Sequence, residues 1–316
     1  MGLFTLVESD LAAVDEVLTA TLTAENPLVR QVAEYLLATS GKRLRPTLVL
    51  LASRFGRHPE AQAVRVVAAA VEMIHLATLV HDDIIDEATV RRGQAAVRQR
   101  FGNPVAVLAG DYLFARAFQL LSDTGRPDIV ALAADIVFVM CQGEIAQNLS
   151  LFRETDAEEY RRRIADKTAH FLAQSCALGA RAAEAPEAVE AGLARYGHHL
   201  GMAFQVVDDV LDWRADPGRL GKPTGGDIAG GVYTLPVLSA LSRPEWASAL
   251  RAQLQRKPVP IEEVRQVLEA SGALDEALAY ARREAGQAVE ALASVPAGPA
   301  REALVALARF VVERDR

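Results

Sequence analysis

The sequence predicts an all-α protein with a single domain over residues 1–316. Three observations support this prediction. Good helix formers, chiefly alanine, leucine, arginine and glutamate, dominate the chain. Long segments repeat apolar residues every three to four positions, and no region shows the alternation typical of strands. Connecting segments are short apart from the glycine-rich DPGRLGKPTGGDIAGG at 216–231, so no linker divides the chain.

The individual helices are placed by apolar spacing and by proline, which is tolerated in the first turn of a helix. Seven prolines lie near expected helix starts: Pro27, Pro46, Pro104, Pro127, Pro186, Pro244 and Pro299. The expected helices cover residues 9–23, 27–39, 44–55, 60–86, 103–122, 127–150, 156–182, 186–214, 233–241, 244–255, 260–269, 273–292 and 298–314. The segment 60–86 is apolar on nearly all sides, which predicts burial within a bundle.

Composition argues against several functional classes. A net charge of −7 is unusual for a nucleic-acid-binding protein, which is usually basic. Two cysteines, Cys141 and Cys176, do not form a disulfide framework, so we expect a cytoplasmic protein. The first residues acquire acidic side chains too early for a signal peptide. The most apolar segment is interrupted by Glu72 and His75, so we expect no stable membrane anchor.

The segment HDDIIDEATVRRG, residues 81–93, concentrates three aspartates in five positions. On a helix, Asp82 and Asp86 share one face, and their repulsion costs the helix about 0.2–0.5 kcal/mol. A cation between them would remove this repulsion. Mg²⁺ is typically held by one or two carboxylates together with the phosphates of a substrate. The spacing therefore indicates a divalent metal site at the end of the helix.

A second Asp-Asp-x-x-Asp motif, formed by Asp208, Asp209 and Asp212, lies in FQVVDDVLDW. Two such motifs in one chain are rare by chance, although two solvated acidic faces are the simpler alternative. Both motifs follow strongly apolar segments, which favours a site beside an apolar cavity. Metal ions bound by both clusters would clamp a diphosphate and stabilise its charge as it leaves.

Basic residues follow both clusters. Arg91 and Arg92 come after the first, and Lys222 lies in the glycine-rich segment after the second. Beside carboxylates, such cations are suited to bind phosphate oxygens. Without the neighbouring carboxylates, a pair of solvated surface charges would be the simpler interpretation. Lys42 and Arg45 in GKRLRP share the face of another helix start, where a bound anion would offset the unfavourable helix dipole. These groups suggest two diphosphate substrates.

In these motifs the sequence resembles the trans-isoprenyl diphosphate synthase (polyprenyl synthetase) family, long-chain type. The matching segments are GKRLRP, DDIID, RRG, DKT at 166–168, FQ at 204–205, DDVLD and GKPTGGD at 221–227. The resemblance covers a core of about 28–240, and a less distinctive helical tail follows at 241–316. It implies one bundle of mostly antiparallel helices around a deep central cavity, usually in a homodimer.

The resemblance also implies a reaction. An allylic diphosphate (farnesyl, geranyl or geranylgeranyl) ionises with the help of Mg²⁺, three ions per active site. The double bond of isopentenyl diphosphate then attacks the carbocation, and a proton is lost. The product is one isoprene unit longer and all-trans.

Roles within this reaction follow from motif positions. The metal ions would be bound by Asp82, Asp86, Asp208 and Asp212, with Asp83 and Asp209 in support. The allylic diphosphate would be bound by Arg91 and Lys222. Isopentenyl diphosphate would be bound by Lys42, Arg45, His75 and Arg92. The carbocation would be stabilised by Lys167, Thr168 and Gln205.

Two positions qualify the resemblance. His75 lies on an apolar helix, where a histidine satisfied within the core is the commoner situation, but it also lies two turns before Asp82, where the family places a substrate ligand. Val232 stands where the family often has a lysine. This difference removes one diphosphate contact and leaves more of that role to Lys222.

Product length depends on the residues below the first cluster. Ala77 and Thr78, about one turn before Asp82, are small where short-chain members of the family tend to place an aromatic ring. We expect an open tunnel that continues past Ile74 and a product of about six to ten isoprene units. Phe138, with Met140, is the candidate for a deeper floor. The alternatives are close helix packing at the small residues and a C20 product.

Two rival functions remain. A class I terpene cyclase also ionises an allylic diphosphate, but it needs no second diphosphate site of the kind that GKRLRP suggests. A non-catalytic subunit that regulates an active synthase would be free to lose metal ligands, and this chain keeps all six aspartates.

Overall fold

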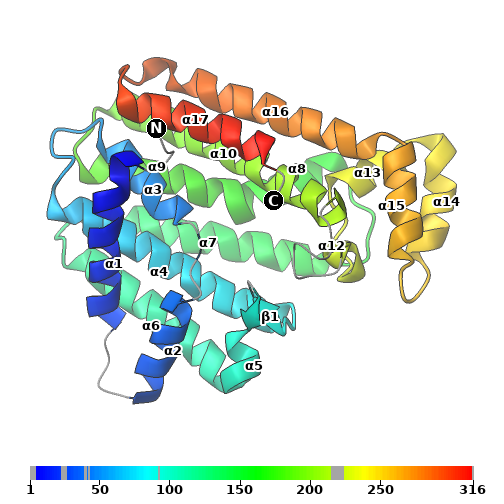
Figure 1. Ribbon diagram of the computed structural model, residues 1–316, viewed down its shortest axis with the longest axis horizontal. Helices are drawn as coiled ribbons and strands as arrows, with labels where there is room; N and C mark the ends of the chain where they lie inside the picture. Colours follow the sequence, from blue (N-terminus) through cyan, green and yellow to red (C-terminus); the bar gives the residue numbers. More distant parts are fainter. Residues whose placement is uncertain are drawn as a thin grey trace. The chain divides into compact units, whose positions relative to one another are not determined.

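The computed structural model describes residues 5–22, 27–38, 41, 43–91, 93–214 and 224–314. Within these ranges the chain is helical apart from loops and one short antiparallel hairpin, in which β1 (Val90–Arg91) pairs with β2 (Gln94–Ala95). Figure 1 shows the helices in sequence order from blue to red. The predicted all-α fold class is confirmed.

The helices of the N-terminal half are η1 (Thr5–Val7), α1 (Glu8–Leu22), α2 (Pro27–Ala38), α3 (Leu44–Ser53), α4 (Gln62–Ile85), α5 (Val97–Phe101), α6 (Asn103–Ser122) and α7 (Pro127–Leu149). Those that follow are α8 (Ala157–Ile164), η2 (Ala165–Ala169), α9 (His170–Ala182), α10 (Glu187–Arg214), α12 (Gly226–Ala229), α13 (Leu235–Leu241), α14 (Pro244–Leu254), α15 (Ile261–Ala270), α16 (Ala273–Ala291), η3 (Leu292–Ser294) and α17 (Pro299–Glu313). The structure adds elements that the sequence prediction lacked, namely the hairpin and the short helices α5 and α12. The expected helix 156–182 also contains the π-helical turn η2.

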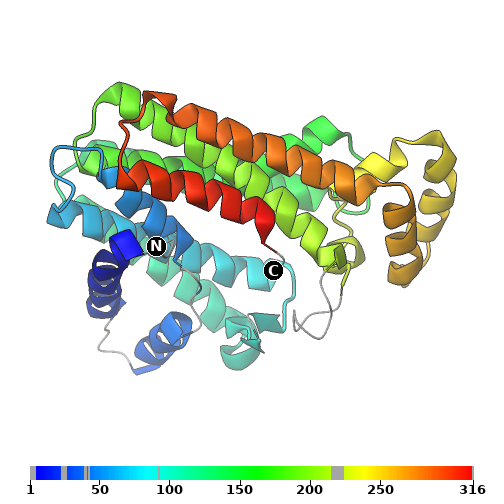
Figure 2. The ribbon, with the colours of Figure 1, turned by 45° about the horizontal axis from the view of Figure 1, so that its top comes forward.

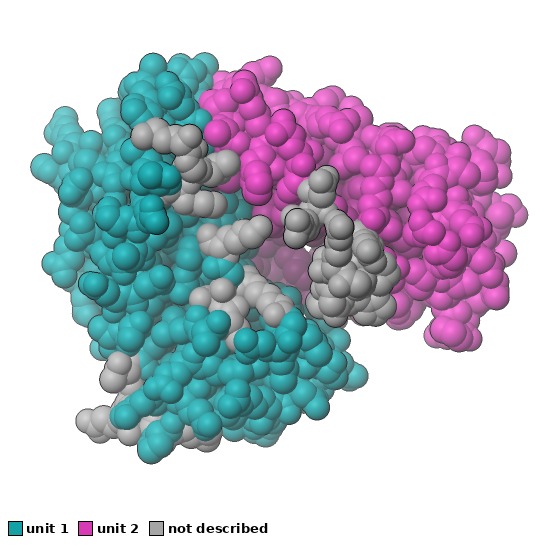
Figure 3. All heavy atoms as spheres, viewed as in Figure 1, with its two compact units in different colours: residues 1–137, 172–194, 292–304 teal, residues 138–171, 195–291, 305–316 magenta. Residues whose placement is uncertain are grey.

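The chain forms two compact units, which Figure 3 colours separately. Unit 1 comprises residues 1–137, 172–194 and 292–304, and unit 2 comprises residues 138–171, 195–291 and 305–316. The helices α7, α9, α10 and α17 contribute residues to both. A single domain over 1–316 stays a prediction.

In unit 1, α4 packs against α1, α3 and α6. Its residues from Val67 to Ile74 are all buried, as the apolar pattern predicted. Glu72 lies within this run and is only 2% exposed. Arg43 compensates its charge, because the Arg43 Nη1 atom lies 2.9 Å from Glu72 Oε1. Without this partner the buried carboxylate would strongly destabilise the fold.

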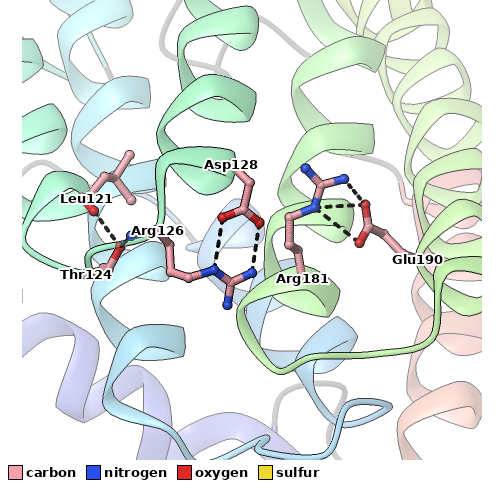
Figure 4. Close-up of polar contacts among 6 residues, drawn as sticks. All are labelled: Leu121, Thr124, Arg126, Asp128, Arg181 and Glu190. Carbon is pink, nitrogen blue, oxygen red and sulfur yellow. Dashed lines mark hydrogen bonds and ion pairs between the residues drawn. The ribbon is translucent and has the colours of Figure 1, made fainter.

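Two ion pairs in unit 1 hold the starts of α7 and α10 (Figure 4). Arg126 donates two hydrogen bonds to Asp128, of 2.9 and 2.8 Å, and Arg181 pairs with Glu190. The hydrogen bonds from Arg126 lower the pKa of Asp128, and the charge of Arg181 lowers it further. The first pair lies within the start of α7, and the second connects α9 to α10 across the turn between them.

In unit 2, α10 and α16 lie side by side, as Figures 1 and 2 show. His199 Nδ1 of α10 is 2.8 Å from Glu284 Oε2 of α16. The core of this unit contains the large side chains Tyr160 and Trp213, each at most 2% exposed. This packing fixes the C-terminal half of α10, which carries the second aspartate cluster.

By length and composition alone, α4, α6 and α7 are apolar enough to cross a membrane. The expectation that interrupting polar residues exclude such segments was therefore too strict. In α4 the interrupting Glu72 is paired with Arg43. The absence of a membrane anchor stays a prediction.

Candidate active site

The first aspartate cluster lies at the C-terminal end of α4 in unit 1. The backbone N–H of Asp86 donates to the carbonyl of Asp82 at 2.8 Å, so the two residues are one helical turn apart. Along this helix His75, Thr78 and Asp82 are partly exposed and Asp86 is exposed, whereas Ile74 and Ala77 are buried. The partly exposed positions recur at helical spacing and therefore share one face. The predicted common face of Asp82 and Asp86 is present.

Asp83 points into the protein and is 3% exposed. Its Oδ1 atom accepts hydrogen bonds from Nε of Arg91 at 2.8 Å and from Nη2 at 2.5 Å. Arg91 lies in β1, so the short hairpin positions the guanidinium against the helix end. Because a guanidinium carries five N–H groups, this pair leaves donors for a phosphate. Asp83 thus supports the site by orienting Arg91.

The GKRLRP motif is held to α4 by its central arginine. Arg43 has a left-handed backbone with φ of 53° and bridges Glu72 and Asp15, the latter at 2.8 Å. Arg45, in the first turn of α3, is partly exposed. Lys42 lies outside the described residues, as do Arg92 and Lys222.

The second aspartate cluster lies near the C-terminal end of α10 in unit 2. Asp208 and Asp212 are partly exposed, whereas Asp209 is 3% exposed. The hydroxyl of Tyr160 donates to Asp209 Oδ2 at 2.5 Å, and the Gln205 amide donates to Oδ1 at 2.9 Å. The middle aspartate of each motif is therefore buried and paired, and the outer two lie on a more accessible face.

A hydrogen-bonded chain continues from Gln205. Its amide oxygen accepts from the Thr168 hydroxyl at 2.8 Å, so a hydrogen-bonded chain connects Thr168, Gln205 and Asp209. Lys167 pairs with Glu144 at 2.5 Å between Nζ and Oε2. Both Lys167 and Thr168 lie in η2, and π-helical turns often occur at functional sites.

Two glycines allow η2 to pack closely in unit 2. A Cβ atom at Gly201 would lie 2.5 Å from Ala169 Cα, and one at Gly143 would lie 3.2 Å from the Lys167 backbone nitrogen. Any larger residue at Gly201 would have to displace backbone. The positions of Lys167 and Thr168 therefore depend on these glycines.

The segment after Lys222 is fastened to Asp212. The backbone N–H groups of Gly226 and Asp227 both donate to its carboxylate at 3.4 Å, and Gly225 N–H donates to its carbonyl at 3.0 Å. Burial raises the pKa of Asp227 well above its usual range, and the negative charges of Asp209 and Asp212 raise it further. The acidic groups of unit 2 are thus close enough to repel one another.

Asp208 is contacted by the end of the chain. The Arg314 Nη2 atom lies 2.6 Å from Asp208 Oδ1, and it also donates to the Phe204 carbonyl at 2.9 Å. The side chain of Asp208 keeps 42% of its surface exposed. Surrounding protein still reduces its hydration and raises its pKa to about 6, against the opposing charge of Arg314.

The donor groups of both clusters fit a hard divalent cation. Carboxylate oxygens are the ligands that Mg²⁺ and Ca²⁺ prefer. The repulsion that raises the pKa of Asp227 is the condition that a bound cation relieves. Among the described residues no three acidic, histidine or cysteine side chains converge as a closed metal cage. An open arrangement is suited to metal ions whose remaining ligands are water and substrate phosphates.

Four residues of this neighbourhood were not singled out from the sequence: Tyr160, Glu144, Asp227 and Arg314. Asp227 ends the GKPTGGD segment and could have been found by that position. The other three reach their partners over distances of 23 to 106 residues in the chain, and no local pattern marks them.

The predicted chain-length residues differ in their surroundings. Ala77 and Ile74 have 0% exposed surface, whereas Thr78 is partly exposed on the face of Asp82. Thr78 Oγ1 donates to the His75 carbonyl at 2.8 Å. Phe138 in α7 is 61% exposed. One turn before Asp82, Thr78 thus has accessible surface whereas Ala77 has none.

Comparison with known proteins identifies the family. The polyprenyl synthetase family model matches residues 26–271. The chain is 38% identical over 316 residues to heptaprenyl diphosphate synthase component 2 of Geobacillus stearothermophilus, covering 99% of this chain and 98% of that protein. It is 38% identical over 317 residues to octaprenyl diphosphate synthase of Escherichia coli strain K12, covering 98% of each.

A solved structure supports the same family assignment. The crystal structure of polyprenyl synthase from Caulobacter crescentus CB15, complexed with calcium and isoprenyl diphosphate, superimposes with a TM-score of 0.92 at 36% sequence identity. The match covers 99% of this chain and 97% of that one. The chain belongs to the polyprenyl synthetase family of prenyltransferases.

Proposed function

We propose that this protein condenses isopentenyl diphosphate with an allylic diphosphate to make a long-chain all-trans polyprenyl diphosphate, of about C30–C50. The observation that carries the proposal is the arrangement shared by both aspartate motifs. In each, the middle aspartate is buried and paired, and the outer two remain accessible for metal ions. The names of the heptaprenyl and octaprenyl relatives support the long-chain assignment.

Asp82, Asp86, Asp208 and Asp212 would hold the metal ions, which we propose to be three Mg²⁺ per active site. The calcium and isoprenyl diphosphate in the related structure support the binding of a divalent cation by this protein. When bound, such cations neutralise the leaving diphosphate. Basic side chains of the protein bind the two diphosphates. Arg91, oriented by Asp83, binds the allylic diphosphate together with Lys222. Lys42, Arg45, His75 and Arg92 bind isopentenyl diphosphate.

The residues around η2 stabilise the carbocation. Thr168 donates its hydroxyl proton to Gln205, so the lone pairs of the Thr168 oxygen can face a cation. Gln205 is fixed at both ends of its amide, and its orientation is therefore set before substrate binds. Preorganised dipoles of this kind stabilise charge without reorganisation during the reaction.

The protein is a cytoplasmic homodimer without a membrane anchor. Exposed apolar residues in each unit support a subunit interface: Val107 and Leu108 on α6 in unit 1, and Phe138, Ile145 and Leu149 on α7 in unit 2. Exposed apolar surface commonly marks protein–protein contacts. The exposed ring of Phe138 fits such an interface as well as it fits a tunnel floor.

The direct test is product analysis. The purified protein is incubated with Mg²⁺, labelled isopentenyl diphosphate and farnesyl diphosphate, and the dephosphorylated products are sized by mass spectrometry. A ladder that ends at C30 or beyond supports the proposal. A stop at C20 would keep the chemistry and replace the long-chain assignment. Loss of diphosphate from farnesyl diphosphate without elongation would indicate a cyclase.

Because one relative is named component 2, the assay is paired with native mass spectrometry of the purified chain. Elongation by a species of two identical chains supports the homodimer. Activity only after addition of a different protein would show that a second component is required.

A further inference from the structure

A cavity lies in unit 2, away from both aspartate clusters in sequence. Its volume is about 390 Å³, and it is lined by α8, α13, α16 and the segment before α8. This volume is within the range of small-molecule sites. Nothing in the proposed reaction uses the cavity.

The acidic groups around the cavity already have partners. Glu154 accepts two hydrogen bonds from Arg251, of 2.8 and 2.7 Å. Asp156 accepts from the Glu159 backbone N–H at 2.7 Å and caps α8. Glu276 pairs with Arg243 at 2.8 Å and accepts from a serine hydroxyl. The hydrogen-bonded partners of these carboxylates are therefore not the cavity's own arginines, and the charge of Arg283 acts on Glu276 only at longer range, where it lowers the pKa of that carboxyl.

Two guanidinium groups in the lining are different. Neither Arg161 of α8 nor Arg283 of α16 forms an ion pair with any residue that the structure describes. Arg283 lies over the ring of Tyr280, with its Cζ atom 5.6 Å from the ring centroid. Arginine without a carboxylate partner in a concave site is well suited to bind a carboxylate or phosphate, because its N–H groups match their oxygens.

The remaining lining residues are aliphatic or carry a hydroxyl. The hydroxyls of Ser239 and Ser242 already donate, to Glu276 and to the Ser239 carbonyl. Leu235, Leu238 and Leu241 of α13 line one side of the cavity. The Oγ1 atom of Thr155 is buried without a hydrogen-bond partner among the described residues. A buried polar atom of this kind is costly unless a ligand or water satisfies it. Leucines beside two guanidiniums that form no ion pair within the described residues match a ligand with an acidic head and a short hydrocarbon body.

The cavity is connected to the second aspartate cluster through α8. Arg161 faces the cavity, and the preceding residue, Tyr160, donates its hydroxyl proton to Asp209. Helix α8 continues directly into η2, which carries Lys167 and Thr168. A ligand that holds Arg161 would therefore act on the helix that positions Asp209 and η2.

From these observations we propose that the cavity between α8, α13 and α16 binds a small anionic amphiphile, whose acidic group contacts Arg161 and Arg283, and that this binding alters prenyl transfer. The binding part stands on its own, and the regulatory part rests on the proposed function.

Binding is tested by isothermal titration calorimetry of the full-length protein with octyl phosphate, without Mg²⁺. Octanoate, octanol and inorganic phosphate are titrated in parallel. We expect Arg161→Gln and Arg283→Gln each to weaken octyl phosphate about tenfold, the effect of losing one charged hydrogen bond. The adjacent exposed arginines give matched controls, Arg162→Gln and Arg282→Gln, which should bind normally. Circular dichroism checks that every variant is folded.

The parallel ligands separate the sources of affinity. Binding of octyl phosphate and octanoate, with much weaker octanol and inorganic phosphate, supports an anionic amphiphile. If octanol bound as tightly as octyl phosphate, the arginines would have no role in recognition. If the test and control variants lost the same affinity for octyl phosphate, the ligand would bind outside this cavity. Regulation is tested in the elongation assay: octyl phosphate should change the rate of the wild type and Arg162→Gln but not of Arg161→Gln. The same response in all three would mean that it acts at the catalytic site. Elongation without octyl phosphate tests the proposed function separately.

Discussion

The guanidinium of Arg314 lies 2.6 Å from Asp208 Oδ1 and is stacked on Phe204, with its Cζ atom 4.0 Å from the ring centroid. The arginine thus occupies an oxygen that we assign to metal binding. Its cation partly offsets the charge of Asp208 when no metal ion is present. Metal binding at this carboxylate has to compete with the ion pair.

Replacement of Arg314 should therefore ease metal binding. We expect Arg314→Gln to lower the Mg²⁺ concentration for half-maximal activity about two- to tenfold, since a charge-assisted pair in a partly exposed place contributes about 0.5–1.5 kcal/mol. Initial rates across a Mg²⁺ series measure the effect. Arg309→Gln is the control, because Arg309 is an exposed arginine on α17, the helix that Arg314 directly follows. A higher Mg²⁺ requirement in Arg314→Gln would instead assign the arginine to substrate binding.

The outer and middle aspartates of the first motif should respond differently. Asp82→Asn should reduce turnover by about 10²–10³-fold or more, because it removes charge where a metal ion binds, and should leave stability nearly unchanged. Asp83→Asn should lower the free energy of unfolding by about 1–3 kcal/mol, because it weakens the buried partner of Arg91. Urea unfolding measures the stability of both variants, and steady-state kinetics measure their turnover. Equal stability losses would contradict the division of roles.

The sequence identified these roles only in part, and the limits have physical causes. The four-residue spacing placed Asp82 and Asp86 on one face, because an α-helix fixes that geometry locally. It could not show that Asp83 pairs with Arg91, since the pair depends on the hairpin that turns the chain back. Arg314 meets Asp208 across 106 residues, and only the packing of α17 against α10 brings them together. The π-helical turn at η2 likewise depends on tertiary packing, which helical periodicity does not record.

Product length should be controlled from Thr78. An aromatic ring there would project from the face of Asp82, so Thr78→Phe should shorten the product sharply, whereas Thr78→Val should not. Mass spectrometry of the dephosphorylated products measures the length. Ala77→Phe should also shorten it, but that ring starts from a position with no exposed surface and should cost about 1–3 kcal/mol of stability by overpacking. An unchanged product in both phenylalanine variants would exclude this part of α4 as the tunnel floor.

The Arg126–Asp128 pair of Figure 4 predicts a pH dependence of stability. The pKa of Asp128 is lowered in the folded state, so the pair stabilises the fold above the unfolded-state pKa of about 3.9 and loses this contribution as the pH falls through the lower folded-state value. Wild type should therefore exceed Asp128→Asn in unfolding free energy, by up to about 1 kcal/mol, at pH 6. The difference should vanish near pH 2. Urea titrations at both pH values test this, and a constant difference would contradict it.

Gly201 should be required for activity more than for folding. A Cβ atom there would lie 2.5 Å from the Cα atom of Ala169, so Gly201→Ala has to displace the backbone of η2. Lys167 and Thr168 move with that turn, and we expect kcat to fall at least about tenfold, because small displacements of positioning groups are costly in catalysis. Gly286→Ala in α16 is the matched control, since nothing lies within 4 Å of its added carbon. Alanine is the better helix former, so the control should gain up to about 1 kcal/mol of stability and keep its activity. Normal kinetics in Gly201→Ala would show that η2 tolerates displacement, and the assignment of Thr168 to carbocation stabilisation would then lose its structural basis.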